Sequence, residues 1–331
     1  MSRADPPSPP VQFVAAARNV LPQFGLPADA RLTLLAAAHN YVFRIDHGAE
    51  RWVLRFQSPR RLRDDARVLQ LEWMQSIRTQ TDVHIPEPVR TLTGDWFVAD
   101  VTAARDETPW ACVLLKWVDG EHLSPPQRFT TGTVLEKVGE VVAKLHQHSS
   151  RFTSSRGASA PHLGTEQIVG RRSALGDGSA QRLIPRAQYA ILLAAAKKVT
   201  AAMKCLEQVQ GQCGLIHADL SPSNWVFQKG EPRLIDFDEF GRGFYLYDLL
   251  GVLWSHASWD EYPTFKEHLL RGYERIRPLA AEIKALADPF QAATLFAWLN
   301  HGCRLSDDAA KAEFLKWVPS TARTIAQFCH V

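Results

Sequence analysis

One polar segment, which lies between short apolar runs, limits the possible fold and chemistry of this chain more than any other part of the sequence does. It contains His217, Asp219 and, five positions after Asp219, Asn224. A turn at 229–232 then separates two strand-like runs, and the second run ends in Asp236. A loop with this spacing can direct Asp219 and Asn224 into one cavity, and the end of the hairpin can bring Asp236 to the same place.

These residue types suit the transfer of a phosphoryl group. Transfer from ATP needs a base that accepts the proton of the attacking hydroxyl, and oxygen ligands that hold magnesium on the phosphates. Asp219 can be the base, and Asn224 and Asp236 can be the ligands. Taken singly, each of these residues could instead cap a turn or a helix. The complete array is much more specific than any one of its members.

At these positions the chain resembles the aminoglycoside phosphotransferase and choline kinase-like family, which has a protein-kinase-like fold. The matching segments are 214–219, 234–239 and 243–249, and a weaker likeness extends over about 40–273. The resemblance implies an α+β, two-lobed fold with an N-terminal antiparallel sheet and helix and a larger, mainly helical C-terminal lobe. It also implies that ATP and Mg2+ bind in the cleft between the lobes. The acceptor would be a hydroxyl of a small metabolite or antibiotic-like molecule.

The resemblance assigns roles within the polar segment residue by residue. Asp219 corresponds to the catalytic base, and Asn224 and Asp236 correspond to the magnesium ligands. His217 would brace the loop, although a satisfied core histidine is an equal alternative. Asp248 corresponds to a buried aspartate that binds backbone amides of the catalytic loop.

Other residues near the motif leave two interpretations open. Asp238 could support the metal or contact the acceptor. Glu239, Asp260 and Glu261 could bind an aminated acceptor or belong to the solvated surface. Aromatic residues also gather late in the chain, where they could cage a quaternary ammonium or form core. They are Trp225, Tyr245, Tyr247, Trp254, Trp259, Tyr262 and Trp298.

Nucleotide-binding positions follow from the same resemblance in the N-terminal part. Arg55, where most kinases have lysine, would bind the ATP phosphates and pair with Glu72 on the next helix. Val53, on the same strand face, would pack on adenine. Lys116 and Val118 lie at the hinge, whose backbone groups would recognise the base. A solvated arginine and a surface glutamate are the alternative for Arg55 and Glu72.

Periodicity divides the chain into a β-rich part and a helical part. Helices are predicted at 11–21 and 64–78, and strands at 41–45, 51–56, 83–89, 96–101 and 111–118. Further predictions are helices near 134–145, at 187–209 and beyond 246, strands at 225–228 and 233–237, and a loop-rich stretch at 149–186. We therefore expect an N-terminal extension and helix at 1–24, a nucleotide-binding lobe at 25–118 and a catalytic, acceptor-binding lobe at 119–331.

Composition argues for a cytoplasmic protein with no nucleic-acid or membrane partner. The net charge is only +3, and the longest apolar run, 189–196, is far too short to span a bilayer. The first ten residues are polar and proline-rich, unlike a signal peptide. Five cysteines without a paired spacing fit reduced thiols. A monomer or homodimer is expected, with a small hydroxyl compound as partner.

Two other functions fit the same fold. The first is a Ser/Thr protein kinase of the stress-response type, which would need a cleft open enough for a peptide. The second is a pseudokinase, a non-catalytic nucleotide-binding scaffold, for which Arg55 in place of lysine is the best support. Because Asp219, Asn224 and Asp236 are all present, we favour the enzyme.

Overall fold

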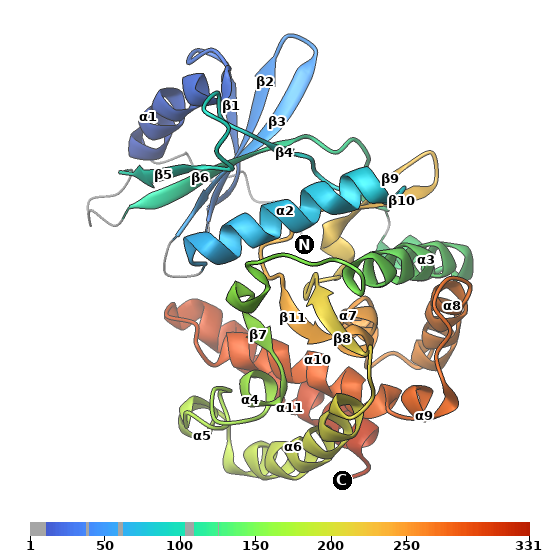
Figure 1. The fold of residues 1–331 in the computed structure, drawn as a ribbon. Coiled ribbons are helices and arrows are strands. Elements are labelled where there is room, and N and C mark those ends of the chain that lie inside the picture. Colours follow the sequence, from blue (N-terminus) through green and yellow to red (C-terminus); the bar gives the residue numbers. More distant parts are fainter. Residues whose placement is uncertain (1–10, 38–39, 59–61, 103–108, 125) are drawn as a thin grey trace. The chain divides into compact units, whose positions relative to one another are not determined.

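A computed structural model describes residues 11–37, 40–58, 62–102, 109–124 and 126–331, so the first ten residues of the expected extension lie outside it. The chain forms two compact units, which Figure 1 shows coloured along the sequence. The N-terminal unit holds the described residues up to Asp119 together with Thr153–Ser159, and the C-terminal unit holds Gly120–Phe152 and Ala160–Val331. The α+β architecture is as predicted. The return of Thr153–Ser159 to the N-terminal unit was not foreseen from the sequence.

An antiparallel sheet forms the centre of the N-terminal unit. Its strands follow the order β1-β2-β3-β6-β4, and β5 also pairs with β6. In the register of the two middle strands, Val53 lies opposite Leu115 and Arg55 opposite Val113. The strands are β1 (Arg31–Ala37), β2 (Tyr41–His47), β3 (Glu50–Gln57), β4 (Pro88–Val89), β5 (Val98–Val101) and β6 (Trp110–Lys116).

Helices pack on both faces of this sheet. Helix α1 (Val11–Val20) and η1 (Leu21–Phe24) share a hydrophobic core with one face, which includes Phe56 of β3. The phenyl ring of Phe13 stacks on Tyr41 at 3.7 Å between centroids. Helix α2 (Asp64–Gln80) packs on the other face. Its buried Arg67 donates from Nε to Oε1 of Gln57 at 2.9 Å. Strand alternation puts the side chains of Gln57 and Phe56 on opposite faces of the sheet. Helix α1 packs into the core of this sheet, so it belongs to the N-terminal unit rather than to a separate extension.

The C-terminal unit is mainly helical and contains two small sheets (Figure 1). One is the hairpin of β9 and β10, and the other has the order β7-β11-β8. Its strands are β7 (His162–Leu163), β8 (Cys213–Ile216), β9 (Trp225–Gln228), β10 (Glu231–Leu234) and β11 (Gly241–Phe244). Its α-helices are α3 (Gly132–Ser149), α4 (Thr165–Ile168), α5 (Ser179–Leu183), α6 (Arg186–Glu207), α7 (Tyr245–Gly251), α8 (Tyr262–Glu274), α9 (Ala281–Lys284), α10 (Ala287–Gly302) and α11 (Asp308–Cys329).

Two predicted strands have different bounds in the structure. The strand predicted at 83–89 is reduced to Pro88–Val89, because Pro86 and Pro88 have no N–H to donate to a ladder. The strand predicted at 233–237 is β10, which begins at Glu231 and ends at Leu234. The chain therefore leaves the hairpin before Asp236 and is free to turn there.

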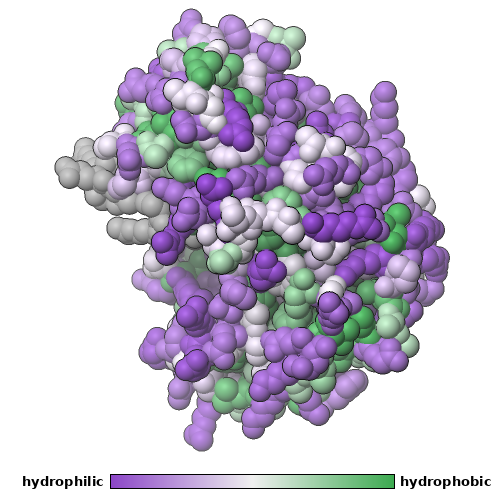
Figure 2. All heavy atoms as spheres, in the orientation of Figure 1, coloured by the Kyte–Doolittle hydropathy of each residue, from purple (hydrophilic) through white to green (hydrophobic). Residues whose placement is uncertain are grey.

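No helix among the described residues is long and apolar enough to cross a membrane. Hydrophilic residues cover most of the face drawn in Figure 2.

Glycines set the close approach of α3 and α8. A Cβ added at Gly139 would lie 2.3 Å from the carbonyl oxygen of Leu269 and 2.8 Å from the amide nitrogen of Tyr273. We expect Gly139→Ala to lower the free energy of unfolding by about 1–3 kcal/mol, because neither backbone can yield without separating the helices. Urea unfolding would measure the change.

Gly251→Ala is the matched control, because a Cβ at that helical position meets no atom within 4 Å. It should leave stability unchanged or raise it by up to about 1 kcal/mol through helix propensity. If Gly139→Ala were as stable as Gly251→Ala, tight packing of α3 on α8 would be contradicted.

Candidate active site

The loop after β8 is held by Asp248, in the first turn of α7. The Asp248 carboxylate accepts the amide of His217 at 3.0 Å and that of Ala218 at 2.7 Å. Ala218 has a left-handed backbone, with φ 68°, which is unusual for a residue other than glycine. Since left-handed residues of this kind persist only where their surroundings impose them, Asp248 fixes the shape of the loop that carries Asp219.

His217 connects this loop to the strand end before Asp236. Its Nδ1 accepts the amide of Asp219 at 3.3 Å, and its Nε2 lies 3.1 Å from the carbonyl oxygen of Ile235. This arrangement requires the tautomer with the proton on Nε2, which donates to Ile235. The imidazole is fully buried and packs edge-on against Phe237 at 4.6 Å. These contacts support a bracing role for His217.

Asp219 and Asn224 are in direct contact. The side-chain nitrogen of Asn224 donates to Oδ2 of Asp219 at 2.8 Å and to the Asp219 carbonyl oxygen at 2.9 Å. Because the nitrogen of this amide is held by Asp219, its oxygen Oδ1 remains as the acceptor. The loop thus orients a carboxylate and an amide oxygen together, as the spacing predicted.

Asp236 lies one residue from a backbone link to Asn224. The amide of Ile235 donates to the carbonyl oxygen of Asn224 at 2.9 Å, and Asp236 then turns with a left-handed φ of 65°. The amide of Asp238 points toward Oδ1 of Asp236, at 3.4 Å. The left-handed conformation therefore occurs at Ala218, directly before the proposed base Asp219, and at the proposed metal ligand Asp236 itself.

This oxygen set fits magnesium. Mg2+ prefers hard oxygen ligands and is usually held by one or two carboxylates together with substrate phosphates. Oδ1 of Asn224 and the carboxylate of Asp236 are ligands of this kind. Over the ranges that the structure describes, no three His, Cys, Asp or Glu side chains gather to hold a metal by themselves, so a metal here would rely on the amide and on phosphate oxygens.

A buried relay extends from Asp248 to Arg277. Nε2 of His146 lies 3.0 Å from Oδ2 of Asp248, and Nδ1 of His146 lies 2.9 Å from the hydroxyl of Tyr273. Arg277 donates to the same hydroxyl at 2.9 Å, so the tyrosine can donate onward to His146 and His146 to Asp248. Sequence analysis missed His146. The available signal was a polar residue directly after Leu145, at the end of the apolar stripe of the predicted helix.

The relay makes stability depend on pH. Burial lowers the pKa of His146, although the carboxylate of Asp248 acts in the opposite direction. His146 therefore binds a proton at a lower pH in the folded protein than in the unfolded chain, where its pKa is near 6.5. This contribution is present above about pH 6.5 and is lost as the pH falls toward the depressed folded pKa, by at most about 1.4 kcal/mol per pH unit. Urea unfolding of wild type and His146→Gln between pH 7.5 and 5.5 should show the steeper loss in wild type. Equal slopes would contradict a buried neutral His146.

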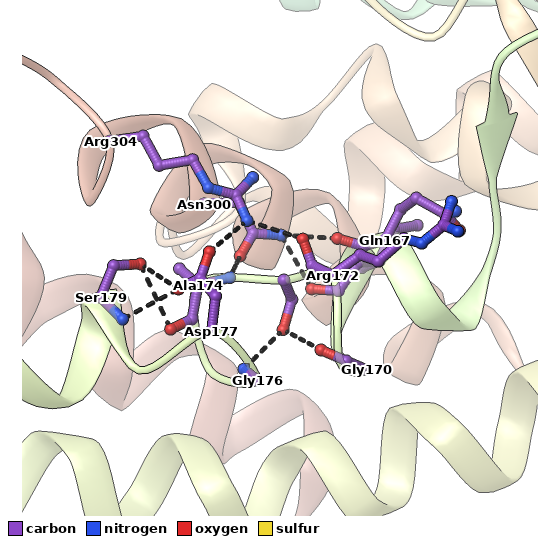
Figure 3. Close-up of polar contacts among 11 residues, drawn as sticks. Gln167, Gly170, Arg172, Ala174, Gly176, Asp177, Ser179, Asn300 and Arg304 are labelled. Atoms are coloured by element: carbon purple, nitrogen blue, oxygen red, sulfur yellow. Dashed lines mark hydrogen bonds and ion pairs between the residues drawn. The ribbon is translucent and has the colours of Figure 1, made fainter.

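A second polar cluster anchors the stretch before α6, which was predicted to be loop-rich. Asn300 of α10 donates to the carbonyl oxygen of Ile168 at 2.8 Å and accepts the amide of Ala174 at 2.8 Å (Figure 3). Arg304 donates to Asp177 at 2.8 Å. Hydrogen bonds from Ser179 and then from Arg304 lower the pKa of Asp177 to about 2. The same stretch contains β7, which pairs in parallel with β11.

Arg55, on β3 of the N-terminal unit, has a buried side chain. Only 7% of it is exposed, and it shares a strand face with half-buried Val53 and buried Gln57. The other face, with Trp52, Leu54 and Phe56, belongs to the hydrophobic core, as the alternation predicted. A solvated Arg55 is therefore wrong.

Glu72 does not pair with Arg55 within the described part of the chain, and this expectation is corrected. Its Oε1 accepts from Nη1 of Arg156 at 3.1 Å, and its Oε2 accepts the hydroxyl of Ser154 at 3.0 Å. Glu72 lies five residues after Arg67, roughly 140° around the helix. Since Arg67 reaches the strand face of Arg55, Glu72 points away from it and holds the Thr153–Ser159 segment instead.

A cavity of about 460 Å3 lies between α2 and the segment around β4, lined by Glu72, Gln75, Thr79, Arg90 and Trp96 among others. None of its lining residues belongs to the loops of Asp219 or Asp236, so we do not assign it to the reaction.

The predicted hinge follows β6. The amide of Lys116 is used within the sheet, where it donates to the carbonyl oxygen of Glu87 at 2.8 Å, and the amide of Trp117 donates to Arg51 at 3.0 Å. Val118 comes next and is half-buried. No backbone partner of its N–H occurs among residues with described positions. Val118 therefore offers a backbone donor of the kind that recognises a purine edge.

Proteins of known function resemble this chain in sequence. The model of the phosphotransferase enzyme family matches residues 31–285. Amicoumacin kinase of Bacillus subtilis (strain 168) is 22% identical over 260 residues, 76% of this chain and 73% of that protein. Homoserine kinase of Gluconobacter oxydans (strain 621H) is 27% identical over 248 residues, 64% of this chain and 78% of that protein.

Solved structures show the same fold. A microcompartment-associated aminopropanol kinase superposes with a TM-score of 0.81 at 22% sequence identity, covering 95% of this chain and 97% of that one.

Proposed function

The chain belongs to the phosphotransferase enzyme family, and we propose that it moves the γ-phosphoryl group of ATP to a hydroxyl of a small molecule. The observation that carries the proposal is the contact of Asn224 with Asp219, at 2.8 Å, one backbone hydrogen bond away from Asp236. The carboxylate proposed as base, Asp219, and the two proposed metal ligands, Asn224 and Asp236, are thus connected through these two hydrogen bonds. An array kept in this form argues against a non-catalytic scaffold.

Asp219 acts as the base in this proposal. Its Oδ2 is held by Asn224, which leaves Oδ1 to take the proton from the attacking hydroxyl. Asn224 and Asp236 would hold magnesium, which would neutralise charge on the phosphates. His217 and Asp248 keep the loop in place and do not contact the reacting atoms. Asp238 either supports the metal or faces the acceptor.

The N-terminal unit contributes nucleotide binding. Arg55 would bind phosphate oxygens, for which a guanidinium is well suited. Val53 would pack on the adenine ring, and the backbone N–H of Val118 would recognise its edge, whereas the N–H of Lys116 is already bound to Glu87. Glu72 would act indirectly, by fixing α2 to the Thr153–Ser159 segment through Arg156.

The relatives support an acceptor that is a hydroxyl-bearing small molecule. They are kinases of amicoumacin, homoserine and aminopropanol. An ADP-release screen with Mg-ATP should test amino alcohols, homoserine, amino sugars, aminoglycosides, polyols and a generic protein substrate. We expect ADP release that depends on a small hydroxyl compound. Release with the protein substrate alone, or with none of the compounds, would overturn the proposal.

The metal ligands give a separate prediction. Asp236→Ala should weaken magnesium-dependent ATP binding about tenfold or more, and Asn224→Ala less, because an uncharged amide contributes less than a carboxylate. Calorimetry with Mg-ATP and with ATP plus EDTA would measure both. Unchanged metal-nucleotide affinity in both variants would contradict the metal site, whereas Asp260→Ala, at an exposed position, should bind as wild type does.

A further inference from the structure

The relay from Asp248 to Arg277 connects the catalytic loop with a side chain near the surface of the C-terminal unit. Its three inner members, Asp248, His146 and Tyr273, are each at most 1% exposed. Arg277 follows Tyr273 by one helical turn and is half-buried. Its Nη2 donates to the carbonyl oxygen of Gly211, in the turn before β8, and its Nη1 to the hydroxyl of Tyr273. Arg277 is therefore held at the outer end of the relay by two hydrogen bonds.

Arg277 determines the direction of the hydrogen bonds in the relay. A guanidinium has donors and no acceptor, so the Tyr273 oxygen accepts from Nη1 at 2.9 Å. Burial raises the pKa of Tyr273 to about 12, so the phenol keeps its proton and donates it to Nδ1 of His146, at 2.9 Å. The proton of His146 is then on Nε2, which donates to Oδ2 of Asp248 at 3.0 Å. The relay thus requires a neutral imidazole of one tautomer.

A second proton on His146 would disrupt this order. An imidazolium also carries a proton on Nδ1, and this proton would face a Tyr273 oxygen that already accepts from Arg277. The phenol proton would then lose its acceptor inside the protein, which is unfavourable for a buried hydroxyl. Arg277 therefore disfavours the imidazolium through the hydrogen bonds of the relay.

The charges that face His146 act in opposite directions. Burial lowers its pKa, the carboxylate of Asp248 in α7 raises it, and the guanidinium of Arg277 lowers it again. Two rings also pack on the imidazole, Tyr245 at 4.6 Å and Tyr273 at 5.6 Å between centroids, and burial raises the pKa of each phenol to about 12, so both are neutral. Other charged side chains of α8 and its C-terminal end reach α3 more than one turn before His146, at Glu136 and Glu140; they are His268, Arg271 and Arg275.

The charge of His146 matters for the catalytic loop because Asp248 divides its hydrogen bonds between the two. Oδ2 of Asp248 accepts from Nε2 of His146 and from the amide of His217, both at 3.0 Å. Oδ1 accepts the amide of left-handed Ala218 at 2.7 Å. An imidazolium binds a carboxylate oxygen more strongly than a neutral imidazole does, so it would compete with the His217 amide for Oδ2. The next residue after Ala218 is Asp219, so the competition would displace the proposed base.

We infer that Arg277 is a positioning residue for phosphoryl transfer, which acts through Tyr273 and His146 to keep the loop of Asp219 in its reactive shape. Arg277 does not touch the reacting groups, since three side chains separate it from the loop. The inference rests on the proposed function, because the shape of the loop affects turnover only if Asp219 is the base.

The test replaces Arg277 and follows both His146 and turnover. Arg277→Met removes the charge and the donors while keeping most of the side-chain length. In 15N NMR of histidine-labelled protein, with the His146 signals identified by their loss in His146→Gln, wild type should keep a neutral ring protonated on Nε2 from about pH 7.5 to 5.5. Arg277→Met should take up the second proton within this range. Over the same range its kcat should fall about tenfold more than that of wild type, with KM for ATP within about twofold.

Two further variants keep the test decisive if Arg277→Met does not fold. Tyr273→Phe removes the hydroxyl that donates to Nδ1, and losing a hydrogen bond to the neutral ring should raise the pKa of His146 in the same way. Arg277→Lys keeps a charge and a donor, so it should keep His146 neutral and restore most of the turnover at low pH.

Arg275→Met is the matched control. Arg275 is an exposed arginine two residues before Arg277, and its partners are Glu136 and Glu140. The variant should match wild type in the NMR signals of His146 and in the pH dependence of kcat, because Arg275 is outside the relay.

His146 that stays neutral in both Arg277→Met and Tyr273→Phe would overturn the inference. So would a kcat that does not fall where His146 takes up its proton, or an equal loss in Arg275→Met, which would show that the effect is general packing. Failure of the proposed function is seen separately, as a wild type that phosphorylates no alcohol in the ADP-release screen, whereas the NMR signals report on His146 without any turnover.

Discussion

Asp219→Asn is expected to lower kcat by about 10³- to 10⁴-fold while affinity for Mg-ATP stays within a few-fold of wild type. The substitution keeps the shape of the side chain, and an amide can still turn its oxygen toward Nδ2 of Asn224, which is 2.8 Å from Oδ2 of Asp219. It removes only the group that accepts a proton. Turnover would be measured at saturating acceptor, and nucleotide affinity by calorimetry.

Asp29→Asn makes the same chemical change at an exposed position outside the catalytic loop and should behave as wild type. Thermal unfolding of both variants should match wild type, which separates loss of the base from loss of the fold. Normal turnover in Asp219→Asn would remove Asp219 from the mechanism.

Arg55→Ala is expected to lower kcat/KM for ATP by about ten- to a thousand-fold, or ~1.4–4 kcal/mol. Arg55 is almost fully buried on the strand face that also carries Val53, and a charge-assisted contact to phosphate is stronger there than on an exposed surface. Arg55→Lys should retain most of the activity, because lysine can serve the same phosphates as a point charge.

Arg51 provides the matched control on the same strand and face. It is largely exposed and pairs with Asp119 at 2.5 Å, so Arg51→Ala should change kcat/KM for ATP by less than about fivefold. If Arg55→Ala turned over ATP as Arg51→Ala does, the phosphate-binding role of Arg55 would be wrong. The assignment of Asp219 would be unaffected, since it depends on other contacts.

Local patterns in the sequence were sufficient to predict that one loop brings Asp219 and Asn224 together. The spacing of Asp219 and Asn224 predicted that both groups would share one place, and the structure puts them in hydrogen-bond contact. Alternation along β3 predicted which side chains enter the core, because successive side chains of a strand point to opposite faces. Spacing within a loop and period along a strand are both local properties.

Predictions that needed contacts between distant segments were less successful. Glu72 was matched to Arg55 from the resemblance to kinases, in which a cation on the third strand pairs with a glutamate of the next helix. In the structure Glu72 instead binds Arg156 of the Thr153–Ser159 segment. His146 was overlooked because its partners, Asp248 and Tyr273, are more than a hundred residues away. Such contacts depend on how helices pack, which hydrophobic periodicity does not specify.

Strand β1 was missed for a different reason. Its sequence, Arg31–Ala37, is rich in leucine and alanine, which favour helices, and its burial shows little alternation. Pairing with β2 makes it a strand all the same. Tertiary context overrides local preference here, as it commonly does in sheets.

The most direct test of the central claim follows the γ-phosphorus of ATP by 31P NMR in the presence of magnesium and the best acceptor of the screen. Wild type should convert this signal into that of a phosphate monoester on the acceptor, in equal amount to the ADP formed, and Asp219→Asn should form almost none. Release of the phosphorus as inorganic phosphate in wild type, or an equal yield of the ester from Asp219→Asn, would contradict transfer to an alcohol with Asp219 as the base.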